Sequence, residues 1–250
     1  MTDISKMQLY GFNNLTKNLS FSFYKLHYIH KSNLKTHYND YINERYNSHR
    51  LSLLLTDICH AIGGNVLNIA QQNYQPQGAS VTLMISEEAQ AESLVAHLDK
   101  SHLCIHTYPE DNIQDGIAIF RADIELSTCG VISPLKVLNY LLEEFNADVV
   151  DIDYRIRGMT RNTLGKKSFN DQNLLNISDF LNQQSKQNYQ IQENNLVSSN
   201  LFHTKLIKKE LIISDYLFQT IESEINKEQQ HPILKRIKGE LGEIFDSSEN

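Results

Sequence analysis

The clearest pattern in the chain is an alternation of hydrophobic and polar residues near its N-terminus. Leu19, Phe21 and Phe23 alternate with polar or amphipathic neighbours, and the pattern can be followed to about Ile29. Successive side chains of a β-strand point to opposite faces of a sheet. The alternation therefore predicts a strand with one face buried against a core.

A long helical segment and a series of strands are predicted after this first strand. Apolar residues recur at helical spacing over Tyr38–Ile62, with a break expected near residues 47–49 and a stop at Gly63. Further strands are predicted at Asn65–Tyr74, Val81–Ser86, His102–Pro109, Gly116–Leu126 and Val149–Arg157. Before the last of these, Ser133 is a suitable N-cap and Pro134 a suitable first residue for a helix.

The order of these elements predicts an α+β fold. Consecutive strands joined by short turns favour a mainly antiparallel sheet with helices on one face. Beyond about Gly165 the chain is rich in Asn and Gln, and only a strand at Phe202–Lys209 and helices near residues 216–224 and 232–245 are predicted. We expect residues 1–164 to form a core and residues 165–250 a C-terminal extension of the same domain.

Composition and charge narrow the class of protein. The chain has 250 residues, with 30 acidic and 23 basic side chains, a net charge of −7. An acidic chain of this kind is not expected to bind nucleic acid or anionic lipid as its main task. The N-terminus lacks the apolar segment of a signal peptide, and no apolar run reaches the ~20 residues that span a bilayer. Three cysteines are too few for a secreted disulfide framework, so a cytoplasmic protein is expected.

The residue types that carry chemistry concentrate between His97 and Gly130. His102, Cys104 and His106 would share one face of a strand, which allows a zinc site, although side chains ~7 Å apart along one strand rarely converge on one ion. A serine or cysteine hydrolase is a second alternative, but Ser101 lacks the surrounding glycines of a nucleophile elbow.

A third interpretation comes from resemblance to a known family. The segments Gly11–Lys17, Tyr74–Ser80, Lys100–Glu110 and Ser127–Gly130 resemble the corresponding motifs of bacterial S-adenosylmethionine decarboxylase proenzymes, in particular the long, enterobacterial-type branch. Several separate motifs in the same order make this resemblance more specific than any single pattern. It implies the family's αββα-type sandwich fold, with which the predicted element order agrees.

The resemblance implies that the chain cuts itself. The Ser101 hydroxyl would attack the carbonyl of Lys100, the resulting ester would break by β-elimination, and residue 101 would become a pyruvoyl group. The products would be a β chain of residues 1–100 and an α chain of residues 101–250. His106 matches the family's proton acceptor in processing, a role that suits an imidazole near neutral pH. Ser80 matches a serine that assists processing.

The same resemblance assigns the decarboxylation step. The amine of S-adenosylmethionine would form a Schiff base with the pyruvoyl group, which stabilises the charge left by CO₂. Cys129 matches the family's proton donor, and a thiol is mostly protonated near neutral pH yet gives up its proton readily. Glu110 matches the carboxylate that binds the ribose hydroxyls, and Tyr74 matches an aromatic residue that stacks on adenine.

Substrate and assembly remain open at this point. Pyruvoyl-dependent decarboxylases of this superfamily also act on arginine or ornithine, and a non-catalytic regulatory paralogue is a third possibility. The resemblance further implies self-association, at least to a dimer and in the long branch to as many as four α and four β chains. It also implies Mg²⁺ as an activator, for which Asp148, Asp151 and Asp153 are carboxylates of the right chemistry but with nothing to select them.

Overall fold

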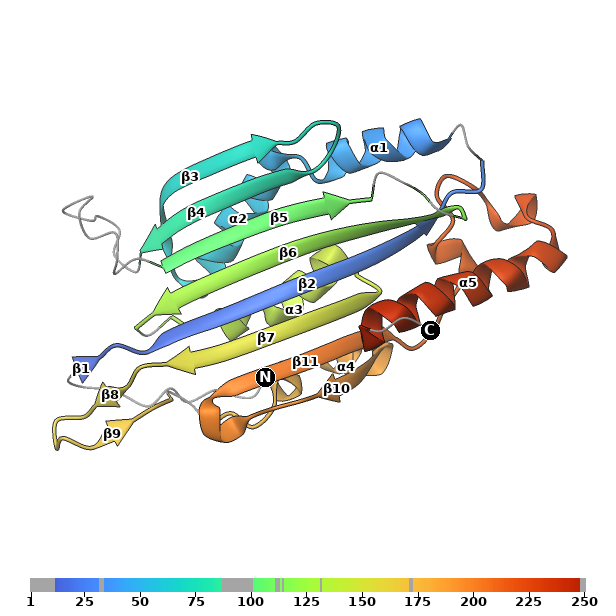
Figure 1. Ribbon diagram of the computed structural model, residues 1–250. Coiled ribbons are helices and arrows are strands. Elements are labelled where there is room, and N and C mark those ends of the chain that lie inside the picture. The colour runs from blue at the N-terminus through green and yellow to red at the C-terminus, as the bar shows by residue number, and fades with distance from the viewer. Residues whose placement is uncertain are drawn as a thin grey trace.

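An eight-stranded antiparallel sheet forms the centre of the molecule in the computed structural model, which describes residues 12–31, 34–86, 101–110, 113, 115–130, 132–170 and 173–247. The strand order is β10-β11-β7-β2-β6-β5-β4-β3 (Figure 1). The two longest strands, β2 (Thr16–Tyr28) and β6 (Ile117–Cys129), pair with each other along their whole length at the middle of the sheet. The α+β class and the antiparallel sheet are thus confirmed.

The remaining elements agree with the predicted ones up to residue 157, with one exception. Pro134–Val137 forms a 3₁₀ helix without a side-chain cap from Ser133, and the α-helix begins only at Leu138. The other strands of the large sheet are β3 (Asn65–Asn73), β4 (Ala79–Ser86), β5 (Ser101–Pro109), β7 (Val149–Arg157), β10 (Tyr189–Glu193) and β11 (Leu201–Lys208). The helices are α1 (Leu34–Arg45), α2 (Ser48–Ile62), α3 (Leu138–Phe145), α4 (Gln183–Asn188) and α5 (Lys227–Asp246). A small second sheet contains β1 (Phe12–Asn13), β8 (Thr160–Arg161) and β9 (Lys167–Ser168).

The apolar face of the sheet is covered by α1, α2 and α3. Leu19, Phe21 and Phe23 of β2 are buried in the main hydrophobic core on this side, as the alternation predicts. The helical segment breaks where expected, because the Asn47 side chain caps α2 by accepting a hydrogen bond from the Arg50 N–H at 3.0 Å. Burial of this face orients β4, β5 and β6, whose alternate residues point to the other side.

Helix α5 lies on the opposite side of the sheet, in front of it in Figure 1, where α2 and α3 are behind. Ile233, Ile237 and Leu241 of α5 form a second core with Leu26 and Val149, which point away from the main core. The expectation that the helices would lie on one face therefore holds for α1–α3 but not for α5. The difference arises because one end of the sheet is apolar on both faces.

The C-terminal region adds strands to the same sheet. The predicted strand is confirmed as β11, which pairs with β7, and β10 follows at the edge. The helix predicted near residues 216–224 is wrong, since this segment contains only a short 3₁₀ turn at Glu222–Glu224. Among the described residues, no helix is both long and apolar enough to cross a membrane.

Candidate active site

Ser101 and Cys129 meet at the point where β5 begins and β6 ends. Cys129 donates its backbone N–H to Ser101 Oγ at 3.2 Å, and its sulfur lies 3.7 Å from the same oxygen. The antiparallel register explains the contact, because His102 pairs with Ser127 and the two strand ends therefore lie side by side. Ser101 is buried, so its hydroxyl is held in a largely water-free position. Lys100 lies outside the described residues.

A second group of candidate residues lies further along the strands. Tyr74 donates its phenol O–H to Ser80 Oγ at 2.8 Å. Ser80 of β4 pairs directly with His106 of β5, and His106 pairs in turn with Asp123 of β6. Side chains directly opposite each other on one face are ~5 Å apart at Cβ, so this row is within mutual reach.

The two groups do not meet within one chain. Ser101 shares the helix-covered side of β5 with Leu103 and Ile105, whereas His106 points to the other side. His106 lies five residue steps along the strand from Ser101, roughly 16 Å at ~3.3 Å per residue. The residues expected to act together thus form two clusters: a first cluster of Ser101 and Cys129, and a second cluster of Tyr74, Ser80 and His106.

Glu110 belongs to the second cluster through the turn between β3 and β4. Its Oε2 accepts a hydrogen bond from Ile119 N–H at 3.2 Å, and its backbone carbonyl accepts one from Gln77 Nε2 at 3.3 Å. Gln77 sits in the same turn as Tyr74, whose N–H is bonded to the Gly78 carbonyl at 2.8 Å. One Glu110 oxygen is therefore engaged with the backbone.

Three residues near these clusters had no predicted role. Lys17 on β2 is fully buried beside the end of β6, Gln77 is buried beside Glu110, and Asp123 faces His106. Lys17 could have been found from the sequence, because Lys17 occupies an inward position in the same alternation as Leu19 and Phe21. A charged residue at such a position interrupts the apolar pattern.

The alternative metal sites gain no support. His102, Cys104 and His106 do share the outward face of β5, but the described part of the chain contains no group of three or more ligating side chains suited to a metal. Nor do the three candidate Mg²⁺ ligands fit such a site. Asp148 is held by two lysine ammonium groups at 3.1 Å each, Asp151 lies 3.9 Å from the ammonium group of Lys205, and Asp153 pairs with a histidine at 2.8 Å.

The three cysteines differ in their surroundings and form no disulfide. Cys59 of α2 is buried, and burial raises its pKa to about 11. Burial likewise raises the pKa of Cys104 on the outward face of β5. Both thiols are thereby kept protonated and unreactive. Only Cys129 lies in contact with Ser101.

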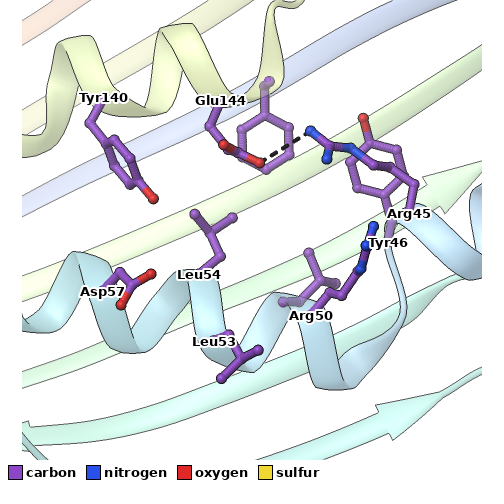
Figure 2. A pocket seen from close by; sticks show the side chains of 10 residues that line it. Arg45, Tyr46, Arg50, Leu53, Leu54, Asp57, Tyr140 and Glu144 are labelled. Carbon is purple, nitrogen blue, oxygen red and sulfur yellow. Dashed lines mark hydrogen bonds and ion pairs between the residues drawn. The ribbon is translucent and has the colours of Figure 1, made fainter.

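A cavity on the helical side lies apart from both clusters. Figure 2 shows this space of about 260 Å³ between α2 and α3, with the Arg45–Glu144 ion pair at one end and Asp57 and Tyr140 at the other. None of the candidate residues lines it. The cavity and the second cluster are on different sides of the sheet.

Comparison with known proteins identifies similar sequences along nearly the whole chain. A family model described as S-adenosylmethionine decarboxylase matches residues 44–158. The S-adenosylmethionine decarboxylase proenzyme of Pseudomonas syringae pv. syringae is 47% identical, covering 96% of this chain and 97% of its own. The proenzyme of that name from Pseudoalteromonas translucida is 45% identical, covering 96% of this chain and 94% of its own. The proenzyme from Marinobacter nauticus is also 45% identical, covering 97% of this chain and 98% of its own.

Two solved structures were also found at low sequence identity. The adenosylmethionine decarboxylase from Aquifex aeolicus has a TM-score of 0.37 and 16% identity, over 58% of this chain and 91% of its own. The Trypanosoma brucei AdoMetDC-delta26 monomer has a TM-score of 0.39 and 14% identity, over 78% of this chain and 66% of its own.

Proposed function

Because this chain belongs to the S-adenosylmethionine decarboxylase family, we propose that it is a self-processing carboxy-lyase. It would convert S-adenosyl-L-methionine into S-adenosylmethioninamine and CO₂, and so supply spermidine biosynthesis. The observation that carries the proposal is the contact of Ser101 with both the thiol and the backbone N–H of Cys129. These are the two residues that the reaction needs next to each other.

Processing would begin at the Ser101 hydroxyl. Its oxygen attacks the carbonyl carbon of Lys100, and the peptide C–N bond is exchanged for an ester C–O bond. Loss of the Ser101 α-proton then breaks the ester, releasing residues 1–100 with a new carboxylate. Water then replaces the freed nitrogen of residue 101, and this nitrogen leaves as ammonia. The Cys129 N–H, already bonded to Ser101 Oγ, orients the attacking oxygen.

The site fits a pyruvoyl group at residue 101. When present, this group supplies a carbonyl that takes up the substrate's amine and stabilises the electrons left by departing CO₂. Cys129 would then deliver a proton to the substrate's α-carbon, for which its sulfur is close enough at 3.7 Å from the present Ser101 oxygen. No Mg²⁺ step is part of this proposal, since the candidate ligands do not fit one.

Substrate contacts are assigned to the second cluster. Tyr74 is 38% exposed, so its ring face is accessible for stacking on adenine and for attraction of a sulfonium cation. Glu110 would bind the ribose hydroxyls through its carboxylate, since such oxygens accept hydrogen bonds strongly.

We propose that two copies of the chain share each active site. His106 and Ser80 point to the side of the sheet that α1–α3 leave uncovered, and they lie too far from Ser101 of their own chain to serve it. Association of two copies would bring the second cluster of one copy to the strand ends of β5 and β6 that carry the first cluster of the other. It would also supply the second sheet layer of the expected αββα sandwich.

A complementation experiment tests this sharing. Coexpressed Ser101→Ala and His106→Ala chains each lack one required group, and neither is expected to cleave efficiently alone. If the site is shared, the His106→Ala chain is cut in the mixture, because its partner supplies His106. An uncut His106→Ala chain in a confirmed mixed dimer would show that one chain supplies both groups.

The C-terminal region is assigned to the same domain as the core. Residues 165–250 contribute β10 and β11 to the large sheet, which supports a core of residues 1–164 with a C-terminal extension rather than a separate unit.

The three thiols outside disulfides favour the reducing cytoplasm as the compartment.

Intact-mass spectrometry combined with an activity assay tests the main proposal. The wild-type protein should give two chains, of residues 1–100 and 101–250, with the second blocked at its N-terminus. Ser101→Ala should remain one chain, whereas the matched variant Ser127→Ala, on the neighbouring strand, should still be cut. CO₂ release is measured with S-adenosylmethionine, arginine and ornithine in parallel. Release only from arginine or ornithine, or an uncut active wild type, would refute the proposal.

A further inference from the structure

The amino group of Lys17 is buried beside the proposed reaction centre. Its side chain is fully buried, and its Nζ donates a hydrogen bond of 3.0 Å to the Gly130 carbonyl. Burial of an ammonium group is costly unless strong hydrogen bonds compensate. An apolar residue would fill the same inward position of β2 at lower cost, as Leu19 and Phe21 do further along. The amino group at this position therefore calls for a specific explanation.

We propose that Lys17 is a positioning residue, which holds the Cys129–Gly130 backbone in place and so determines which carbon the Cys129 thiol protonates. This inference rests on the proposed function and extends it. The segment Gly11–Lys17 belongs to the motifs that resemble the family, yet no role was assigned to it. Lys17 acts through Gly130 and Cys129 rather than by touching the reacting atoms.

The register of the sheet places Lys17 at the required point. Lys17 pairs with Thr128, the residue before Cys129. At Gly130 the chain leaves the strand with φ +64°, a left-handed conformation. Two hydrogen bonds hold it there. Lys17 Nζ of β2 donates to the Gly130 carbonyl at 3.0 Å, and the Gly130 N–H donates to the carbonyl of Leu15, just before β2, at 3.2 Å.

Cys129 transmits this constraint to residue 101. One peptide unit separates the carbonyl that Lys17 holds from the Cys129 N–H and thiol, both of which contact Ser101 Oγ. Without the ammonium group, the Gly130 carbonyl would lose this restraint, while the Leu15 contact with the Gly130 N–H would remain. The thiol would then be free to shift relative to residue 101.

The position of the thiol matters because two carbons compete for its proton. Protonation at the substrate's α-carbon gives the amine product and restores residue 101. Protonation at the α-carbon of residue 101 instead leaves the substrate's nitrogen there after water is added, so that residue 101 becomes alanine. The remainder of the substrate departs as an aldehyde, and the enzyme molecule is inactivated. A displaced thiol should raise the share of the second outcome.

The experiment compares Lys17→Met with the control Lys205→Met. Lys205 makes the same kind of contact, from Nζ to the Phe245 carbonyl at 2.8 Å, but on β11 and remote from residue 101 in the strand order. Each processed protein is incubated with S-adenosylmethionine, and the share of α chains with an alanyl N-terminus is followed by Edman degradation, which the pyruvoyl group blocks. CO₂ release in the same samples gives the number of turnovers.

For Lys17→Met we expect the alanyl share per turnover to rise at least roughly tenfold, since a misplacement of about 1 Å can cost ~10²-fold in a positioned reaction. Lys205→Met should give the same alanyl share per turnover as the wild type. Equal alanyl shares in all three proteins would overturn the proposal. If Lys17→Met folds but is not cut, Lys17→Gln is measured in its place, and failure of both folded variants to be cut also overturns it. A wild type that releases no CO₂ would instead refute the proposed function.

Discussion

The phenol of Tyr74 donates a hydrogen bond of 2.8 Å to the Ser80 hydroxyl. The bond links two residues with different proposed tasks, since Tyr74 would stack on the substrate and Ser80 would assist chain cleavage opposite His106. The ring of Tyr74 would serve the first task and its hydroxyl the second. The two tasks can therefore be separated by substitution.

Tyr74→Phe keeps the ring and removes the hydrogen bond. We expect cleavage of the chain to slow by up to about tenfold, the loss of one hydrogen bond worth ~1 kcal/mol. The KM of the processed enzyme should stay near the wild-type value, whereas Tyr74→Leu should raise it. Cleavage is followed by gel electrophoresis after synthesis, and KM by CO₂ release.

Tyr108→Phe is the matched control for Tyr74→Phe. Tyr108 lies on the same side of β5 as His106 but is 47% exposed, and within the described part of the chain its contacts are those of its ring. Loss of the Tyr108 hydroxyl should leave the rate of chain cleavage unchanged. Equal slowing by both variants would mean that the Tyr74–Ser80 bond has no specific part in processing.

Cys129→Ala should separate cleavage from decarboxylation. The Cys129 N–H that orients Ser101 belongs to the backbone and is retained, so the chain should still be cut. Decarboxylation should fall by about 10²-fold or more, the usual contribution of a positioned acid. Cys104→Ala should retain activity, because its thiol lies on the outward face of β5 and burial raises its pKa. Full activity of Cys129→Ala, measured as CO₂ release, would exclude the thiol as proton donor.

The fold could be predicted from the sequence wherever one face of an element is buried. Alternation in β2 and helical spacing in α2 both reflect the main core, and both were predicted nearly to their ends. Strand β10 was missed because it lies at the edge of the sheet, where the polar side chains of Gln190 and Gln192 are exposed. The position of α5 was also missed, since the second core that it completes joins residues distant in sequence.

The candidate site was predicted as a set of residues but not as an arrangement. Resemblance supplied Ser101, Cys129 and His106, yet only the register of β5 and β6 shows that the first two meet and that the third lies on the other side of the sheet. Strand alternation alone predicts opposite faces for residues 101 and 106. The proposed sharing of the site between two copies follows from this arrangement and not from the sequence pattern.

Asp148→Asn should destabilise the protein strongly. The Asp148 carboxylate is fully buried and accepts hydrogen bonds from Lys25 Nζ at 3.1 Å and from Leu26 N–H at 2.9 Å, with Lys208 Nζ also 3.1 Å away. Removing its charge leaves two lysines without a counter-charge, which typically costs about 3–5 kcal/mol. Because Lys208 is on β11, the loss should also loosen the C-terminal strands. Urea unfolding at neutral pH measures the change.

The matched control for Asp148→Asn is Asp153→Asn. Asp153 has the same type of charge and pairs with His203 at 2.8 Å, but its side chain is 58% exposed. An exposed pair of this kind contributes at most about 1 kcal/mol. If both variants lose the same stability, the buried carboxylate is not the anchor proposed for the C-terminal strands.

His27 should make the protein less stable in mild acid. Burial lowers the pKa of His27 from 6.5 to about 4, with a further lowering from Lys25 and an opposing effect of Asp148. Its ring packs against Tyr38 and Phe218. The folded form thus keeps His27 neutral at a pH where the unfolded chain protonates it. The stability it contributes is present above about pH 6.5 and is lost as the pH falls towards about 4.

The expected loss attributable to His27 is about 2 kcal/mol between about pH 7.5 and about pH 5. His27→Phe keeps the ring contacts and removes the titrating group, so its unfolding free energy should fall less than that of the wild type over the same interval. Urea unfolding of both proteins at the two pH values gives the comparison, in which effects of all other titrating groups cancel. If the difference in unfolding free energy between the two proteins stays constant with pH, His27 titrates alike in the folded and unfolded chains.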